Sequence, residues 1–467
     1  MVRARNGPPE IARTNPDAYE SLLRAKVRNL QRLLARATDG ELPRIETFES
    51  ERQHFRVRAD FTAWCEADDV RFVMFNRGDK RTPHEVRHYP MGSRRINELM
   101  PRVLCALEAE LALRDRIHDV RFLTTLSGDA AVTLTYNRRL GADGEWKEAA
   151  ARLVDSLGAG PMGQPVKVIG RSQGVKLVIN GDTVEERLAV GGGRGECIYT
   201  QAEGEFSQPN AQVCEHMLSW AYDATRGLEH SDLVELFCGN GCFTVCLAPN
   251  FRRVVAAELS AASVALARRN LAANGLSNVS VVQLSAESFA RGLTSPGSGG
   301  GISEAVGVSG PHGGRRVRSP LEQAAPVDAQ TLFVDPPRPG LDAICRAFAS
   351  RFERVLYMSC NPATLARDVT ELRKTHRVAR LAAFDQFPYT HHLVCSPGLP
   401  IASPLHVCWA CWSILGAFRW RRASTAVALT RLSPSSVSQE AGVLLERRLP
   451  TAVHIPRTAR AGLGLRP

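Results

Sequence analysis

The stretch LVELFCGNGCFTV, residues 233–245, has the pattern of an apolar strand that runs into a glycine turn and then a helix. Glycines let the backbone of such a turn approach a ligand, and the helix that follows begins with unpaired amides. The spacing differs from the GxGxxG pattern of dinucleotide sites, because Phe243 and Thr244 follow the second glycine. Glu258 ends the next apolar run, where a carboxylate can bind ribose hydroxyls. The pattern favours an S-adenosylmethionine site, and a plain tight turn is the alternative.

Strands and helices alternate on both sides of this turn, which predicts a doubly wound, Rossmann-like α/β domain over residues 206–396. The expected strands are DLVELF (232–237), RVVAAEL (253–259), VSVVQL (279–284), TLFVDPP (331–337), RVLYMSC (354–360) and VARLAAFD (378–385). A glycine- and serine-rich stretch, residues 292–326, interrupts the alternation and is expected to be a flexible insertion.

The first half of the chain has a different pattern. An amphipathic helix is predicted for residues 17–38, so residues 1–43 are expected to form an N-terminal helical segment. Short alternating runs and a helix predicted for residues 96–113 are typical of an α+β domain. We expect that domain to cover residues 44–205.

Two basic runs in the first half suggest contact with RNA. They are ERQHFRVRAD (51–60) and RGDKRTPHEVRH (77–88), which lie beside Phe55 and Phe75. Cationic side chains bind phosphates and aromatic rings stack on bases, so the combination suits an RNA-binding domain. Each run alone is more often a solvated face of a protein.

Charge is unevenly distributed along the chain. The formal net charge is +11, but residues 397–467 hold nine Arg, two Glu, no Lys and no Asp. This tail has no sustained hydrophobic period, and we expect it to be disordered or aberrant. No apolar run of 18 residues predicts a membrane span, and the N-terminus lacks the apolar core of a secretion signal. We expect a cytoplasmic protein without a membrane partner, although the Arg-rich start leaves an organelle address open.

The twelve cysteines are scattered in a way that favours reduced thiols in an intracellular protein. Cys238, Cys242 and Cys246 recur at a spacing of four and could suggest zinc or an iron–sulfur cluster. They overlap the glycine turn and have no second cluster nearby, so we expect no metal.

Two further strand ends carry reactive side chains. Asp335 is followed by two prolines that fix a rigid loop, placing its carboxylate beside the cofactor sulfonium or a target base; a simple strand exit is the alternative. Cys360 follows an apolar strand and precedes a helix start at Asn361-Pro362. A buried thiol is the ordinary interpretation, but that position favours a reactive thiolate. A thiolate with a methyl donor suggests addition to C6 of a pyrimidine, which makes C5 nucleophilic.

Five ordered motifs resemble the RNA 5-methyluridine methyltransferases, and most closely the bacterial tRNA (uracil-5-)-methyltransferase type. They are FSQPN (206–210), ELFCGNG (235–241), VDPPRPGL (334–341), YMSCNPATL (357–365) and FDQFPYTHH (384–392). The first half agrees in HFRVRADFTAW, RFLTTLSGDAAVTLTY and VIGRSQGVKLVI, so the resemblance covers roughly residues 10–395 without the insertion.

The resemblance implies roles for individual positions. Gln208, Phe237, Glu258 and Asp335 match S-adenosylmethionine contacts, and Cys360 matches the nucleophile. The implied reaction forms 5-methyluridine at position 54 in the T-loop of tRNA, through a bond between the thiol and C6 of a flipped-out uridine. The implied protein is a monomer whose partner is tRNA. A related ribosomal RNA methyltransferase is an alternative, but the clustered N-terminal cysteines and a TRAM-like domain of those relatives are not evident.

The chain departs from the family at two positions. Cys242 stands where the family commonly has a polar residue such as Asn, and Val394 stands where it has the Glu that acts as general base. Valine cannot accept a proton, so one hypothesis is an RNA-binding or RNA-folding homologue that does not turn over, unless Asp385 or His391 substitutes. Another is that an unspliced intron or a frameshift begins after Leu393, where the composition also changes.

Overall fold

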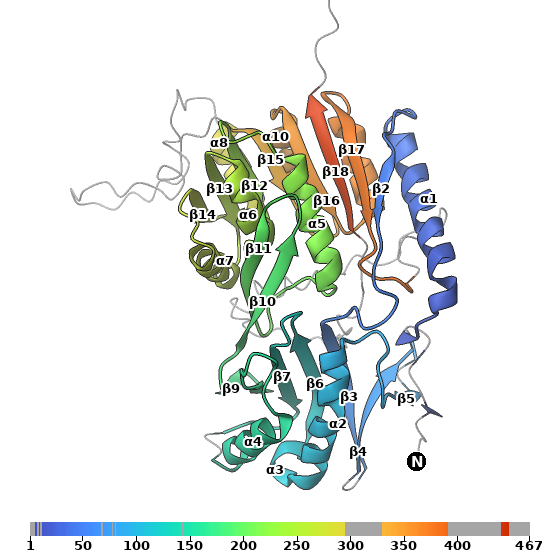
Figure 1. Cartoon of the computed structure of the whole chain (residues 1–467), viewed down its shortest axis with the longest axis vertical. Coiled ribbons are helices and arrows are strands. Elements are labelled where there is room, and N and C mark those ends of the chain that lie inside the picture. The colour runs from blue at the N-terminus through green and yellow to red at the C-terminus, as the bar shows by residue number, and fades with distance from the viewer. Residues whose placement is uncertain are drawn as a thin grey trace, which may run out of the picture.

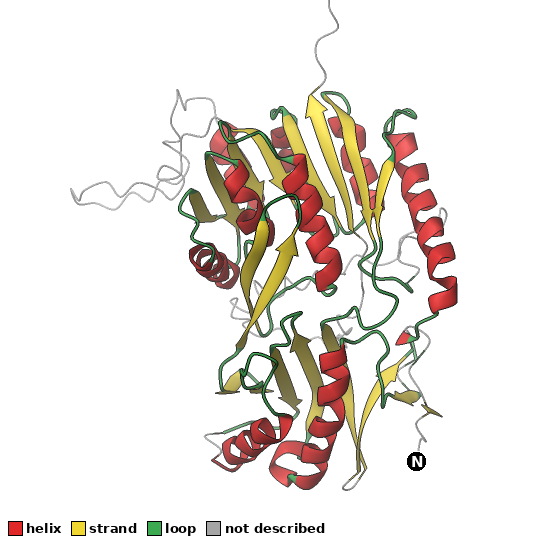
Figure 2. Ribbon diagram, viewed as in Figure 1, coloured by secondary structure: helices red, strands yellow, loops and turns green. Residues whose placement is uncertain are grey.

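The computed structural model describes residues 5–6, 9, 12–66, 69–76, 78–79, 81–141, 144–294, 329–390 and 440–447. Within these residues, two eight-stranded sheets lie one beyond the other along the long axis of the molecule, with a two-stranded hairpin between them (Figure 1). Figure 2 shows helices against both large sheets. The α/β class and the doubly wound arrangement predicted from the sequence are confirmed.

The C-terminal sheet is mostly parallel. Its strands, in spatial order, are β14 (Val279–Gln283), β13 (Arg253–Glu258), β12 (Asp232–Leu236), β15 (Ala329–Val334), β16 (Arg354–Ser359), β18 (Glu440–Arg447), β17 (His376–Phe384) and β2 (Ile45–Phe48). All neighbouring pairs are parallel except the two that involve β18, which is antiparallel to both β16 and β17. The carboxyl ends of the parallel strands therefore lie at one edge of the sheet, where this fold places ligands.

Helices cover both faces of this sheet because its strands are apolar on both sides. The core of one face includes residues of α5 (Ala211–Ala224), α6 (Cys242–Leu247) and α7 (Ala261–Ala273). The core of the other includes residues of α1 (Tyr19–Ala37), α8 (Ala286–Thr294), α10 (Ala343–Ala349) and α11 (Pro362–Leu372). Short 3₁₀ turns, η2 (Pro16–Ala18) and η3 (Ala248–Asn250), precede α1 and follow α6.

The N-terminal sheet is mostly antiparallel. Its strands in spatial order are β1 (Arg5–Asn6), β5 (Pro83–Glu85), β4 (Asp69–Phe75), β3 (Arg58–Glu66), β6 (Ile117–Thr124), β7 (Ala130–Tyr136), β8 (Lys167–Ser172) and β9 (Val175–Ile179). Their core includes residues of α2 (Arg94–Ala109), α3 (Leu111–Arg114) and α4 (Gly144–Leu157). The hairpin β10 (Thr183–Val190) and β11 (Gly195–Ala202) contributes its apolar face to the core around α5 and α6.

Two expectations need correction, and one element was not anticipated. Strand β2 comes from the start of the expected 44–205 domain but pairs with β17 in the other sheet, and the β10–β11 hairpin was not anticipated. Glu440–Arg447, within the expected disordered tail 397–467, forms a central strand of the C-terminal sheet. Its apolar residues Val443–Leu445 are buried there, which a disordered tail could not achieve.

Several predictions fall on positions that the structure does not describe. The 292–326 insertion lies outside the described residues except for its first three positions, which end α8. His391, His392 and Val394 also lie outside them. Among the described helices, none is long and apolar enough to span a membrane.

Candidate functional site

Four of the five residues expected at the site follow neighbouring strands at the carboxyl edge of the C-terminal sheet. Glu258 ends β13, Phe237 follows β12, Asp335 follows β15 and Cys360 follows β16. These strands are adjacent in the order β13-β12-β15-β16, and all run in the same direction. Three strand spacings separate the outer pair, a span of about 14 Å. The strand order thus places Cys360 on the far side of Asp335 from the glycine turn.

The glycine turn is held in shape by the acid at the end of the next strand. Phe237, Gly239 and Gly241 all have positive φ, at 64°, 55° and 80°. Glu258 accepts hydrogen bonds from the Gly239 amide (3.0 Å, to Oε2) and from the Ser260 amide (2.8 Å, to Oε1). A Cβ added to Gly239 would meet no atom within 4 Å, so the space in front of the turn is open. An open glycine turn beside an ordered carboxylate fits a nucleoside ligand.

Two carboxyl groups beside this turn have raised pKa values. Burial raises the pKa of Asp335 to about 7. Glu235, inside β12, is 1% exposed, and burial together with the Asp335 charge raises its pKa to about 8. Its Oε2 has no hydrogen-bond partner in the described structure. Glu235 is the first residue of ELFCGNG (235–241), but its burial could not be read from the sequence, since carboxylate side chains are usually exposed.

These pKa values predict that stability falls as pH rises. Between about pH 4.5, the ordinary value of Glu, and pH 8, folded Glu235 holds a proton that the unfolded chain releases. Unfolding free energy then decreases by at most about 1.4 kcal/mol per pH unit for this group. Glu235→Gln removes that contribution. Urea unfolding at pH 5.5, 6.5 and 7.5 should therefore show that the unfolding free energy of this variant decreases less with pH than that of the unchanged protein.

Glu196→Gln is the matched control, because the Glu196 side chain is 53% exposed on β11. It should keep the slope of the unchanged protein. An equal slope for Glu235→Gln and the unchanged protein would contradict the assignment of the proton to Glu235.

The loop that carries Cys360 is bonded to the Asp335 loop. Asn361 caps α11 by accepting from the Ala363 amide (3.1 Å) and donates through Nδ2 to the Arg338 carbonyl (3.1 Å). The Thr364 hydroxyl donates to the same carbonyl at 3.1 Å. The partly exposed Cys360 therefore stands on a braced turn at the amino end of a helix, which is a position that favours an anion.

Gln208, the fifth expected residue, lies where the 206–210 loop meets the segment after β17, rather than at the strand ends. Its Oε1 accepts from Gln386 Nε2 at 3.4 Å, which joins the 206–210 loop to the segment after β17. The same loop contacts the N-terminal sheet, because the Arg58 guanidinium of β3 donates to the Ser207 carbonyl (3.3 Å). Next to these contacts, Phe206 is 65% exposed.

Of the two aromatic residues expected to stack on RNA, Phe75 at the end of β4 is partly exposed, whereas Phe55 is not. Phe55 is 3% exposed and packs in the core of the N-terminal sheet, so it cannot offer its ring to a base. Its ring centroid lies 6.4 Å from that of Tyr389, which packs against the same core. Phe206, which sequence reasoning placed only in a cofactor motif, is the exposed ring near the site.

A buried ion pair anchors the segment that leads toward the two histidines. Lys26 on α1 contacts Asp385 at 2.8 Å, with side chains 7% and 0% exposed. The Lys26 ammonium also donates to the carbonyls of Phe387 (2.7 Å) and Pro388 (2.9 Å). Burial lowers the pKa of Lys26, while the Asp385 charge opposes that shift. Asp385 is thus committed to the structure and is a poor substitute for a general base.

The cysteines near the turn do not form a metal site within the described ranges, which hold no cluster of three or more suitable ligands. Cys242 Sγ lies 3.7 Å from Cys214 Sγ of α5. The departure from the family pattern at position 242 therefore fills a contact between α5 and α6.

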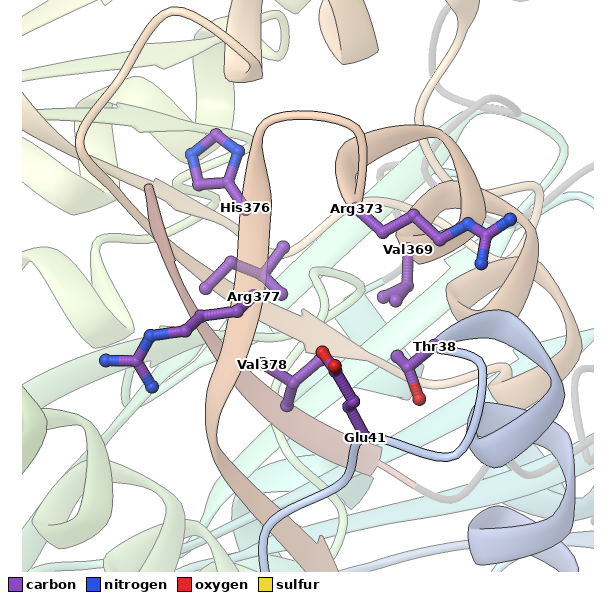
Figure 3. A pocket seen from close by; sticks show the side chains of 8 residues that line it. Thr38, Glu41, Val369, Arg373, His376, Arg377 and Val378 are labelled. Carbon is purple, nitrogen blue, oxygen red and sulfur yellow. The ribbon is translucent and has the colours of Figure 1, made fainter. Parts of the chain in front are cut away.

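Figure 3 shows a further small pocket. It is lined by residues at the end of α1, the end of α11 and the beginning of β17, among them Thr38, Arg373 and His376. Since β17 and β16 are both antiparallel to β18, the beginning of β17 lies at the amino edge of the sheet. This pocket is therefore separate from the site.

Comparison with known proteins identifies relatives along most of the chain. The profile of the family described as tRNA (Uracil-5-)-methyltransferase matches residues 18–297 and 323–399. The tRNA/tmRNA (uracil-C(5))-methyltransferase of Pseudomonas aeruginosa (strain LESB58) is 44% identical over 386 residues, covering 81% of this chain and 96% of that protein. The protein of the same name from Azotobacter vinelandii is also 44% identical, over 384 residues, with 81% and 96% covered.

A solved structure has the same fold. It is the Pyrococcus abyssi tRNA (uracil-54, C5)-methyltransferase in complex with S-adenosyl-L-homocysteine, with a TM-score of 0.57 and 16% identity. The match covers 91% of this chain and 83% of that one.

Proposed function

The chain belongs to the tRNA (uracil-5-)-methyltransferase family, and from that membership we propose that it methylates C5 of the T-loop uridine at position 54 of tRNA through a bond between Cys360 and C6. Methyl transfer from S-adenosylmethionine to tRNA is the activity of the family. Cys360 and Asp335 follow adjacent strands, and the glycine turn follows the strand on the other side of Asp335. This arrangement is the observation that supports the proposed bond between Cys360 and C6.

The cofactor assignment is supported by the chemistry of the turn. Glu258 and the open backbone at Gly239 are suited to the nucleoside part, with Phe237 and Gln208 as further contacts. Bound there, S-adenosylmethionine supplies an electrophilic methyl group. Asp335, on the strand between the turn and Cys360, can orient the reacting groups in either protonation state near neutral pH.

Uracil C5 is a weak nucleophile, and Cys360 supplies the activation. Addition of its thiolate to C6 forms a C–S bond and moves the C5=C6 electron pair into an enolate, with charge at C5 and O4. The enolate carbon then accepts a methyl group. Removal of the C5 proton restores the C5=C6 bond, breaks the C–S bond and returns the thiolate. The braced turn around Asn361 keeps the sulfur in place through both steps.

The target base must leave its stack to reach a thiol at the sheet edge. We infer that the N-terminal sheet and its helices, which lie within the expected 44–205 domain, contribute to holding the RNA that the C-terminal sheet modifies. Exposed Phe206 lies in a loop that contacts both sheets and could stack on an unpaired base. A monomer supplies every residue that the proposal uses.

The proposal is tested by incubating the protein with labelled S-adenosylmethionine and unmodified tRNA, with the same tRNA carrying cytidine at position 54, and with ribosomal RNA. We expect label in 5-methyluridine of the first RNA only. Label in ribosomal RNA but not in tRNA would show that the substrate is ribosomal RNA instead of tRNA. Label in both tRNAs would overturn the assignment to the T-loop uridine.

A further inference from the structure

Strand β18 places an acidic residue at the level of Cys360. Ser359 of β16 pairs with Ala441, and the ladder is antiparallel. One step further along that ladder, the position opposite Cys360 is Glu440. On the other side of β18, Glu440 pairs with Phe384, the last residue of β17. The first residue of β18 therefore lies between the end of the cysteine strand and the start of the loop Asp385–Thr390.

The C-terminal sheet requires this strand. When the seven strands from β12 to β18 are numbered 1 to 7 along the chain, their spatial order in the sheet is 3-2-1-4-5-7-6. β18, the seventh strand, therefore lies between the fifth and the sixth. Without it, β16 and β17 would each present a row of unpaired backbone groups in the interior. Val443, Leu444 and Leu445 are at most 5% exposed and complete the cores of both faces. Residues 440–447 are thus part of the fold despite their place in the sequence.

The connection to β18 has an unusual length. Adjacent antiparallel strands are commonly joined by a few residues, yet β17 ends at Phe384 and β18 begins at Glu440, which leaves 55 residues between them. Without residues 394–439 the connection would be nine residues, 385–393. The chain would then read FPYTHHL-EAGVLLER, with an acid in the place that Val394 occupies.

The intervening 46 residues also differ in composition. Residues 394–439 contain four Arg but no Lys, Asp or Glu, and three of the six Trp of the whole chain. Every valine codon begins with GT, and one of the two glutamine codons ends with AG. The segment begins with Val394 and ends with Gln439, so its boundaries can match those of an in-frame intron.

We propose that Glu440 supplies the carboxylate that removes the C5 proton, and that residues 394–439 are an insertion that the fold and the reaction do not need. This inference rests on the proposed function. The Glu440 carboxylate takes the proton from C5, the C–H electron pair forms the C5=C6 bond, and the C6–S bond breaks to return the Cys360 thiolate. The carboxylic acid then loses its proton to water.

Other nearby acids are less suitable. Asp385 is held by Lys26, and Glu235 is buried inside β12. Asp335 lies on the opposite side of β16 from β18. Among the described residues, Glu440 is the acid whose backbone lies beside Cys360 on the side of the loop 385–390.

The test compares Glu440→Gln with Glu446→Gln in the full chain. Glu446 belongs to the same strand but pairs with Arg354, at the opposite end of β16. With unmodified tRNA and S-adenosylmethionine, Glu440→Gln should release 5-methyluridine about 10²–10⁴-fold more slowly and accumulate a covalent protein–RNA complex. Glu446→Gln and Val394→Glu should release product at the unchanged rate. Unchanged release by Glu440→Gln, or increased release by Val394→Glu, would overturn the role of Glu440.

The insertion is tested by deleting residues 394–439. The shortened chain should bind S-adenosylmethionine, form the complex with tRNA and release product at least as fast as the full chain. Loss of folding or of complex formation would show that the segment is needed. Sequencing transcripts across codons 393–440 should find Leu393 joined to Glu440. An RNA carrying 5-fluorouridine at position 54 has no C5 proton, so trapping on it does not depend on Glu440. Failure there would count against the proposed function instead.

Discussion

Cys360→Ala should lower 5-methyluridine formation by at least about 10⁴-fold, because removal of a nucleophile that forms a covalent intermediate eliminates the main pathway. The loss should appear in kcat. Binding of S-adenosylmethionine should be nearly unchanged, because the glycine turn and Glu258 lie on other strands. Single-turnover assays with labelled cofactor, together with calorimetric titration of the cofactor, separate the two effects. No covalent protein–RNA complex should form.

Cys105→Ala is the matched control, since Cys105 is an exposed thiol on α2 of the other sheet. It should methylate tRNA at the rate of the unchanged chain. Residual activity of Cys360→Ala within tenfold of the unchanged protein would contradict nucleophilic catalysis at this residue.

Lys26→Met should destabilise the fold by about 3–5 kcal/mol, because it leaves the Asp385 carboxylate buried without its cation. The Asp385 side chain is 0% exposed, and Lys26 also holds the carbonyls of Phe387 and Pro388. The segment after β17 would lose its anchor to α1. We therefore expect a large loss of product formation in addition to a lower unfolding midpoint in urea.

Arg24→Met is the control on the same helix, because the Arg24–Glu20 pair is 64% and 58% exposed and should contribute less than about 1 kcal/mol. Lys26→Met combined with Asp385→Leu removes the buried charge and should recover part of the stability. Equal stability of Lys26→Met and Arg24→Met would contradict the anchoring role of the pair.

Sequence reasoning was strongest where the chemistry lies at the ends of regular strands. Runs such as TLFVDPP and RVLYMSC predict their own strands, and doubly wound topology brings strand ends to one edge. The sequence pattern alone therefore predicts that Glu258, Asp335 and Cys360 lie at one edge of the sheet. Their lateral order depends on strand pairing, which local patterns do not encode.

Long-range contacts account for what could not be predicted. Lys26 and Asp385 are 359 positions apart, and nothing local in an amphipathic helix singles out one lysine as buried. β18 was not predicted because GVLL is a short apolar run that follows a long segment without Lys, Asp or Glu. Its partners β16 and β17 decide its conformation. The sequence pattern alone therefore showed Val394 in place of a carboxylate and gave no reason to look for one at Glu440.

Trapping on RNA that carries 5-fluorouridine at position 54 tests the central claim most directly. Because fluorine takes the place of the C5 proton, no base can remove a proton from C5 and the C–S bond cannot break. The adduct formed after methyl transfer should therefore persist through denaturation. We predict one stable protein–RNA complex that requires S-adenosylmethionine, with peptide mapping that places the nucleotide on Cys360 and no complex for Cys360→Ala. Absence of a complex, or attachment at a different residue, would contradict the account.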